Sequence, residues 1–251
     1  MLLDVDRVSK RFGGVRALEE VSLALPESGV FGLIGPNGAG KTTLLNILSG
    51  TYQASSGSIR FLGRDFSRTR AHRIAQAGIA RTYQNIRLFE ANTVLENVIV
   101  AQNSRAPLYG LQSVFWPGGK AERALAGETK RLLELMDLWD KRDFLSGALS
   151  YGEQRRLEIA RACALKPRLL LLDEPSAGMN AAETDALWSR IDTLRRGGMC
   201  LLLVEHDMEL VMRRCQHVFV LNFGEMIAEG SPAVIQKDRS VIEAYLGEEE
   251  D

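Results

Sequence analysis

The sequence is poor in the residues that build disulfide or zinc sites. Its 251 residues include only three cysteines, Cys163, Cys200 and Cys215, and three scattered histidines. The cysteines lie too far apart in the sequence to form a CxxC pair. Because disulfide frameworks and zinc sites are typically marked by cysteines or histidines at short, regular spacings, we expect reduced thiols in a cytosolic protein instead.

Long apolar runs are also missing. The longest, residues 169–172 and 200–204, fall far short of the about 20 residues that a membrane helix needs. The first ten residues, MLLDVDRVSK, carry aspartates where a secretion signal has basic residues followed by an apolar run. We therefore expect that the chain does not itself span a membrane.

Neither sign of charge is in excess. The 31 lysines and arginines nearly balance the 32 aspartates and glutamates, so the formal net charge is −1. Such a chain has no overall basic field to attract nucleic acid, and we expect no nucleic-acid partner. The remaining composition, 45% hydrophobic and 25% charged, is that of an ordinary globular protein with a large core.

Apolar runs alternate with helix-like segments along most of the chain. Three short runs predict buried strands: residues 30–34, 169–172 and 200–204. Each is followed by a segment with helical periodicity: residues 41–48, 181–195 and 208–214. This alternation predicts an α/β fold with a largely parallel sheet.

Other regions depart from this alternation. Near the N-terminus, VSLALP and SGSIRFLGRDF alternate or carry turn residues, as antiparallel strands do. Residues 93–165 lack buried strands and follow helical periodicity, around a proline- and glycine-rich stretch at 106–119 that we expect to be a surface loop. A hairpin is predicted to turn at residues 222–225.

One segment matches the phosphate-loop pattern GxxxxGK[ST]. It consists of Gly35, Pro36, Asn37, Gly38, Ala39, Gly40, Lys41 and Thr42. It lies between a predicted buried strand and a predicted helix, which is the context that the motif requires. Glycines let main-chain N–H groups point at phosphate oxygens, and the helix start adds a favourable dipole. Lys41 can reach the β- and γ-phosphates, and the Thr42 hydroxyl can ligate Mg²⁺.

The apolar run at 169–172 ends in two acids, Asp173 and Glu174. By themselves they could equally be the polar end of a core strand. Beside a phosphate loop, Asp173 is suited to hold Mg²⁺ through water, and Glu174 to polarise the attacking water as a general base. The two motifs together predict a nucleoside triphosphatase.

A further segment narrows the class. LSYGEQ, residues 149–154, stands directly before the acidic strand and resembles the signature segment of ABC ATPases. The chain is similar to that family over essentially its whole length. The other matching elements follow in the family's order: Phe12 against adenine, the Q-loop Gln84, the D-loop residues 176–180 and the H-loop His206. Singly, Phe12 could be a core residue, Gln84 a polar loop residue and His206 a strand-end residue.

The chain departs from the commonest family pattern in two segments. The signature has Tyr151 where glycine is commonest and Glu153 before the glutamine, and the D-loop ends in Asn180 where aspartate is usual. Ser150 and Gly152 are retained, so a hydroxyl and N–H groups at a helix start remain for phosphate. The Asn180 substitution leaves the D-loop contacts across a dimer open.

The resemblance implies an ATP- and Mg²⁺-dependent ATPase that works as a pair of cassettes. Two cassettes stack head to tail, and each nucleotide is covered by the phosphate loop of one and the signature of the other. Ser150, Gly152 and Glu153 would then act on the partner's nucleotide. The remaining site residues would act in their own chain: Phe12, 35–43 (which includes Thr43), Gln84, Asp173, Glu174 and His206. Thr42, Gln84 and Asp173 are the implied metal ligands.

The fold implied is an α/β P-loop (RecA-like) core with an N-terminal antiparallel β subdomain and an inserted helical subdomain. We expect one ABC ATPase domain over residues 1–251, with its core at 1–92 and 166–251 and the helical subdomain at about 93–165.

Finer matches indicate a subfamily. RTYQNIRLF, SYGEQRRLEIARA and VIEAYLGEE resemble the ATP-binding subunits of branched-chain amino-acid importers (the LivG type). This implies a peripheral protein at the cytoplasmic face of the cell membrane, with permease subunits docked in a groove near residues 84–89. Urea or amide importers and lipopolysaccharide exporters are close alternatives, and a soluble or regulatory ABC protein is a more distant one. The solute itself is not encoded, because the cassette does not touch it.

Overall fold

The computed structural model describes residues 1–103 and 120–246, which form two compact units. The first unit contains residues 1–81, 168–174 and the described part of 197–251. The second contains the described parts of 82–167 together with 175–196. The chain therefore passes from one unit to the other several times.

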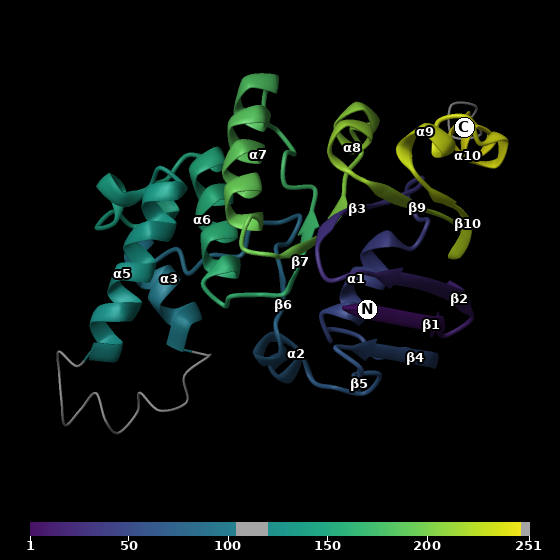
Figure 1. The fold of residues 1–251 in the computed structure, drawn as a ribbon, viewed down its shortest axis with the longest axis horizontal. Helices are drawn as coiled ribbons and strands as arrows, with labels where there is room; N and C mark the ends of the chain where they lie inside the picture. The colour runs from purple at the N-terminus through teal and green to yellow at the C-terminus, as the bar shows by residue number, and fades with distance from the viewer. Residues whose placement is uncertain (104–119, 247–251) are drawn as a thin grey trace. The chain divides into compact units, whose positions relative to one another are not determined.

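A six-stranded sheet forms the centre of the first unit (Figure 1). Its strands, in spatial order, are β10 (Glu225–Gly230), β9 (His217–Asn222), β3 (Gly29–Ile34), β8 (Cys200–Val204), β7 (Leu169–Asp173) and β6 (Ile79–Arg81). All neighbouring pairs are parallel except β9 and β10, which form the predicted hairpin. Every residue of β3, β7 and β8 is buried, which explains why these strands are continuous apolar runs.

A second, antiparallel sheet contains the N-terminal strands of the same unit. Its order is β2 (Val15–Leu25), β1 (Leu3–Phe12), β4 (Ser56–Phe61) and β5 (Arg64–Asp65). Side chains from both sheets share one hydrophobic core, in which Phe61, Leu44 and Phe219 are almost completely buried. The predicted α/β core with an antiparallel β subdomain is confirmed.

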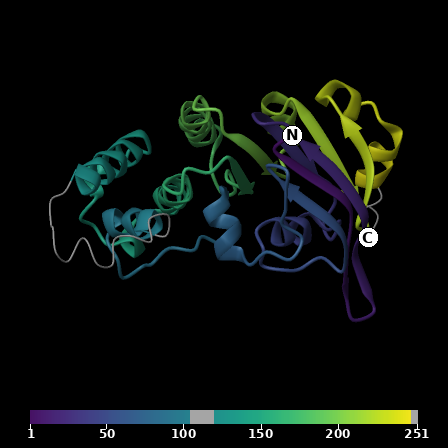
Figure 2. The same ribbon diagram turned by 60° about the horizontal axis from the view of Figure 1, so that its bottom comes forward.

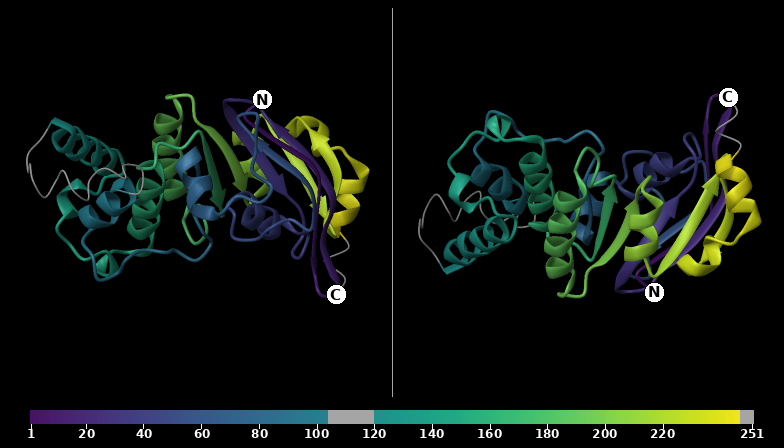
Figure 3. Two further views of the ribbon diagram at one scale, coloured as in Figure 1. Left: turned by 90° about the horizontal axis from the view of Figure 1, so that it is seen from below. Right: turned by 90° about the horizontal axis from the view of Figure 1, so that it is seen from above.

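The helices of the first unit follow its strands. They are α1 (Lys41–Leu48), α2 (Ala71–Ala77), α8 (Met208–Arg214), α9 (Pro232–Ile235) and α10 (Arg239–Leu246). Figure 3 shows α9 and α10 beside β10 at the C-terminal end of the described chain. The helix start of α1 and the carboxyl ends of β7 and β8 lie at one edge of the sheet, because β3, β8 and β7 are parallel neighbours.

The second unit is helical. Its elements are α3 (Val94–Asn103), α5 (Lys120–Leu135), α6 (Tyr151–Cys163), α7 (Ala181–Arg195) and the 3₁₀ turns η1 (Trp139–Lys141) and η2 (Ser146–Ala148). Figure 2 shows α3, α5 and α6 packed together. The described residues of the expected helical subdomain, 93–103 and 120–165, fall within this unit, whereas the loop expected at 106–119 lies entirely outside the described residues. No helix in the described part of the chain has the length and apolarity to cross a membrane.

Candidate functional site

The phosphate loop joins β3 to α1 and depends on its glycines. Gly35 has φ of 147°, and a Cβ there would lie 2.0 Å from the Leu221 carbonyl oxygen. Gly40 has φ of 103°, and a Cβ there would lie 2.7 Å from the Ala17 carbonyl oxygen. Only glycine fits either position without displacing main chain. At Gly38, by contrast, a Cβ would meet no atom within 4 Å, so this side of the loop is open.

Lys41 lies across the loop. Its side chain is buried, and its Nζ donates to the carbonyl oxygens of Gly35 and of Pro36, the latter at 2.8 Å. The first turn of α1 has no side-chain cap, because its N-cap residue is Gly40. Thr42 is exposed beside Lys41. The loop therefore combines an ammonium group with the positive end of a helix, which is the arrangement that binds phosphate.

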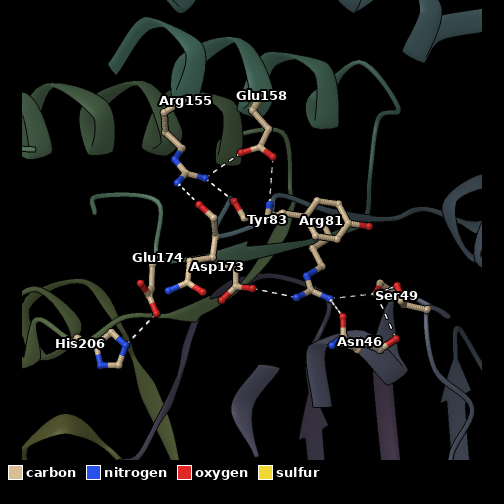
Figure 4. Close-up of polar contacts among 11 residues, drawn as sticks. Asn46, Ser49, Arg81, Tyr83, Arg155, Glu158, Asp173, Glu174 and His206 are labelled. Carbon is tan, nitrogen blue, oxygen red and sulfur yellow. Dashed lines mark hydrogen bonds and ion pairs between the residues drawn. The ribbon is translucent and has the colours of Figure 1, made fainter. Parts of the chain in front are cut away.

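Asp173, at the end of β7, is held by an arginine that sequence reasoning missed. Arg81 Nη2 lies 2.9 Å from Asp173 Oδ2, and both side chains are almost completely buried (4% and 3% exposed). Arg81 Nη1 also donates to Asn46 Oδ1 on α1 at 2.7 Å and to Ser49 Oγ at 3.3 Å (Figure 4). This guanidinium thus ties the strand end at Asp173 to the helix that follows the phosphate loop.

Glu174 and His206 meet at the same sheet edge. Glu174 follows β7 and His206 follows β8, and their Oε1 and Nε2 atoms lie 2.8 Å apart (Figure 4). Glu174 has φ of 48°, which is an uncommon conformation for a non-glycine residue. Its N–H donates to the Val204 carbonyl oxygen at 2.9 Å. Glu174 is therefore held at both main chain and side chain, beside a half-exposed imidazole.

Phe12 is 41% exposed at the end of β1, so the ring is not part of the core. It packs edge-on against Tyr52, with the ring centroids 5.2 Å apart. Lys10 Nζ lies 4.8 Å from the Phe12 centroid. Neither Tyr52 nor Lys10 was indicated by sequence motifs. The three side chains form an exposed aromatic and cationic surface on the first unit.

The signature segment lies in the second unit, at the start of α6. Ser150 is the N-cap, and its N–H and Oγ–H each donate to Glu153 Oε2 at 3.0 Å. Glu153 also accepts a hydrogen bond from Lys141, which, as the largest cause, lowers the pKa of its carboxyl group. Glu153 is therefore an ionised part of a capping box that orients Ser150. Gly152 lies in the first turn of the same helix.

The D-loop residue Asn180 has a local role. It is the N-cap of α7, where its Oδ1 accepts from the Glu183 N–H at 3.0 Å and its own N–H donates to Glu183 Oε2 at 3.0 Å. Asparagine and aspartate are comparable N-caps, which accounts for the asparagine at this position.

Gln84 also lies in the second unit, in an exposed segment between β6 and α3. Its main-chain carbonyl accepts from Arg155 Nη2 at 2.8 Å. Sequence reasoning singled out Gln84 but not Arg155. The first unit thus brings together the phosphate loop, Asp173, Glu174 and His206, and the second unit contains Gln84 and the signature.

These residues fit a nucleoside triphosphate with a divalent cation. The open side of the phosphate loop and its ammonium group suit a polyphosphate. Among the residues that the structure describes, no cluster of three or more histidine, cysteine or acidic side chains could form a metal cage. Mg²⁺ commonly needs none, because it is held by one or two protein oxygens together with substrate phosphates. Thr42 and Asp173 offer such oxygens.

Comparison with known proteins agrees with this assignment. Residues 18–177 match the family model of the ABC transporter, and residues 225–251 match that of the branched-chain amino acid ATP-binding cassette transporter. The chain is 43% identical to the high-affinity branched-chain amino acid transport ATP-binding protein BraF of Pseudomonas aeruginosa, with 98% of each chain covered. It is 42% identical to LivG of Salmonella typhimurium, with the same coverage.

A solved structure has the same fold. The ADP conformation of MJ1267, an ATP-binding cassette of an ABC transporter, superposes with a TM-score of 0.84 and is 30% identical, with 98% of each chain covered. The chain therefore belongs to the ATP-binding, ATP-hydrolysing subunits of ABC transporters, in the group of the branched-chain amino-acid transport ATP-binding proteins.

Proposed function

We propose that this chain hydrolyses MgATP to drive the import of branched-chain amino acids. The observation that carries the proposal is the Glu174–His206 contact of 2.8 Å, at the sheet edge where the phosphate loop begins α1. A carboxylate at the end of an apolar strand, held by an imidazole beside a phosphate loop, is an arrangement suited to activating water.

The phosphate loop binds the nucleotide. The loop N–H groups of residues 37–40 and the first turn of α1, with Thr42 and Thr43, surround the phosphates. Lys41 turns from the loop carbonyls toward them. Phe12 stacks on the adenine, since its ring is exposed and lies beside Tyr52. Because stacking is similar for most bases, this contact contributes affinity and little discrimination.

Thr42, Asp173 and Gln84 are the proposed metal ligands. Mg²⁺, when bound, neutralises charge on the phosphate oxygens and so favours attack on the terminal phosphate. Arg81 pairs with Oδ2 of Asp173 and so fixes the orientation of this carboxylate at the strand end. Asp173 would hold the cation through water.

Glu174 accepts the proton of the attacking water. The hydrogen bond to His206 orients its carboxylate, and the positive φ of its main chain fixes the residue at the strand end. His206 orients Glu174 and contacts the terminal phosphate through its remaining polar edge.

A second cassette completes the site. Ser150 and Gly152, at the start of α6, cover the terminal phosphate held by the partner, and Glu153 orients Ser150 through the capping box. ATP favours the closed pair, and hydrolysis removes the shared phosphate and lets the pair reopen. A ligand can drive a conformational change only through such a difference in affinity between two states.

Permease subunits dock on the second unit at residues 84–89. Phe89 is 51% exposed, and its main chain is held by two buried residues, since its carbonyl accepts from Ser146 Oγ at 2.9 Å and from Asn97 Nδ2 at 3.1 Å. Phe144 and Leu145, next to Ser146, are also more than half exposed. A rigid backbone that presents exposed apolar side chains suits a membrane subunit at the cytoplasmic face.

The solute is assigned through the relatives alone. BraF and LivG are named for branched-chain amino acid transport, and the C-terminal family match carries the same description. None of the proposed site residues is placed to contact a transported solute, so uptake must be measured in the assembled transporter. The chain, reconstituted with the permease subunits and binding protein of a branched-chain amino-acid importer, should drive ATP-dependent uptake of leucine, isoleucine and valine. Uptake of urea, or export of lipopolysaccharide, would reject this solute class.

Substitution of Glu174 tests the chemistry. Glu174→Gln keeps the size of the side chain and removes the base, so turnover should fall about 10²–10⁴-fold while ATP binding is retained and an ATP-bound dimer accumulates. Glu229→Gln is the matched control, because Glu229 lies 3.9 Å from another histidine, His217, of the same unit. Near-parent hydrolysis in Glu174→Gln would remove Glu174 from its proposed role.

A further inference from the structure

A buried ion pair lies on the inner face of α6. Arg155 and Glu158 are 0% and 2% exposed, and Arg155 Nη1 lies 2.9 Å from Glu158 Oε2 (Figure 4). Burial raises the pKa of Glu158, and the charge of Arg155 is the largest effect that opposes this rise. Two charges removed from water in this way need further hydrogen bonds to be stable. Those bonds come from the segment that contains Gln84.

Four hydrogen bonds join the pair to the main chain of residues 83–87. Arg155 donates to the carbonyl oxygens of Tyr83 at 2.6 Å and Gln84 at 2.8 Å. Glu158 Oε1 accepts from the N–H groups of Tyr83 at 3.2 Å and Arg87 at 3.3 Å. This segment forms neither helix nor strand, so its hydrogen bonds to α6 replace those that a regular element would supply.

Tyr151 extends the same cluster to the signature. Its hydroxyl oxygen accepts from Arg155 Nη2 at 3.0 Å, one turn along α6. Its half-exposed ring lies beside Gly178 of the D-loop, where a Cβ would be 3.6 Å from the ring. Tyr151 is also one of the two residues, with Glu153, at which this signature departs from the commonest family sequence. The departure thus places a hydroxyl on Arg155 and a ring against the D-loop.

We propose that Tyr151, Arg155 and Glu158 are positioning residues that join the segment 83–87 to the signature helix as one rigid piece. The inference rests on the proposed docking of permeases at residues 84–89. Movement of this segment away from α6 would leave the buried guanidinium and carboxylate without the four hydrogen bonds to the main chain, which is strongly unfavourable. A permease that displaces the segment therefore displaces α6 with it. The state of the membrane partner is thereby transmitted to Ser150, at the start of α6.

The first test is amide exchange in the isolated chain. Arg155→Lys keeps a positive charge beside Glu158 but cannot donate the forked pair of hydrogen bonds. The exchange rates of the Tyr83 and Arg87 amides should rise about 10- to 100-fold, as measured by NMR. Arg156→Lys is the matched control, because the neighbouring Arg156 faces Asp137 and Glu153 instead. Unchanged exchange in Arg155→Lys would overturn the proposal.

A milder variant keeps the test available if Arg155→Lys does not fold. Tyr151→Phe removes only the hydroxyl that accepts from Arg155. Exchange at Tyr83 should then rise by about two- to tenfold, as expected for loss of one hydrogen bond. Exchange equal to the parent in this variant would exclude Tyr151 from the link.

The second test uses the assembled transporter. In the parent protein, hydrolysis should be stimulated by the membrane subunits and their solute. Arg155→Lys should lose most of this stimulation, while ATP binding and the unstimulated rate change by less than about twofold. If Arg155 had only a structural role, the stimulated and unstimulated hydrolysis rates would fall together. If stimulation stayed complete while the Tyr83 and Arg87 amides exchanged faster, the proposed link between the permease and Ser150 would be overturned.

The two proposals can fail separately. If the parent chain is not stimulated by any membrane subunit, the proposed function and the transmission that rests on it are both overturned. If stimulation is normal in the parent and survives in Arg155→Lys, only the positioning role is overturned.

Discussion

The two units hold their functional residues by different means. In the first unit, β3, β7 and β8 are parallel neighbours, so the phosphate loop, Glu174 and His206 meet at one sheet edge as a consequence of strand order. In the second unit, the segment around Gln84 is irregular and is held by the side chains of Arg155 and Glu158. Topology positions one group, and a buried ion pair positions the other.

This difference predicts how each unit responds to substitution. A strand end supported by a fully buried sheet keeps its place when one side chain changes. A segment without a hydrogen-bonded ladder depends on the few side chains that hold its main chain. Single substitutions in the first unit should therefore lower activity or stability without displacing its main chain. Single substitutions in the second unit should displace the main chain of the segment around Gln84.

The largest expected effect follows from breaking the Arg81–Asp173 ion pair of the first unit. Arg81→Met removes the guanidinium from the buried Asp173 carboxylate and should cost about 3–5 kcal/mol of unfolding free energy, measured by urea denaturation. The double variant Arg81→Met/Asp173→Leu should recover most of the loss, because neither charge remains buried. If the double variant were as unstable as the single one, the ion pair itself, and not the sheet, would be the source of the folding stability at this strand end.

Alkylation of the buried cysteines can show which of the two units is destabilised in the Arg81→Met variant. Burial raises the pKa of Cys200, in the first unit, and of Cys163, in the second, to about 12, so both thiols should resist alkylation while folded. Arg81→Met should increase alkylation of Cys200 more than that of Cys163. Equal increases would indicate that the units unfold together.

The next largest effect concerns the start of α6. Ser150→Arg puts a cation where the partner's terminal phosphate should lie, so hydrolysis should fall about 10²–10³-fold or more. ATP binding should persist, because the phosphate loop of the first unit is intact. The measurement is ATPase activity in the assembled transporter beside nucleotide binding to the isolated chain. Normal hydrolysis would exclude the head-to-tail pair.

Mixing variants tests whether the site is shared. A dimer of Ser150→Arg with Lys41→Ala gathers both lesions into one composite site and leaves the other intact. Some hydrolysis should return if one intact site is sufficient. If both sites must hydrolyse ATP together, the dimer should close again without turnover. Recovery of neither would indicate that each chain works alone.

A smaller effect is expected at Phe12. Phe12→Ala should weaken ATP binding about two- to tenfold, measured by titration calorimetry, because stacking on the base is lost. The melting temperature should change little, since the ring is 41% exposed. A lower melting temperature with unchanged affinity would assign the ring to the Tyr52 contact instead.

The smallest effect is pH-dependent. The Lys141 hydrogen bond lowers the pKa of Glu153. The contribution of this ionised carboxylate to the free energy of unfolding is therefore fully present above the ordinary glutamate pKa, and it is lost as the pH falls through the lowered pKa. Glu153→Gln should reduce stability at pH 7 by about 0.5 kcal/mol or less, since Lys141 is partly exposed. Melting curves of parent and variant should converge at low pH, and a gap that persists there would exclude the charge as the cause.

The motifs were predictable because each is local. The phosphate loop needs glycines at fixed spacings before a helix, and the buried strand before Asp173 is a continuous apolar run, so both are visible in the sequence. Ser150 and Asn180 were found for the same reason, although their capping boxes appeared only in the structure.

The amino-acid sequence alone determined the fold class, the nucleotide site and the family, because short-range patterns of glycine, charge and apolar residues carry that information. The tertiary structure decided which distant side chains hold those motifs in place. Arg81 and Asp173 are 92 positions apart, and Arg155 reaches a carbonyl 72 positions away. Arginines in such positions resemble exposed ones in a sequence, and only the fold shows that they are buried and paired.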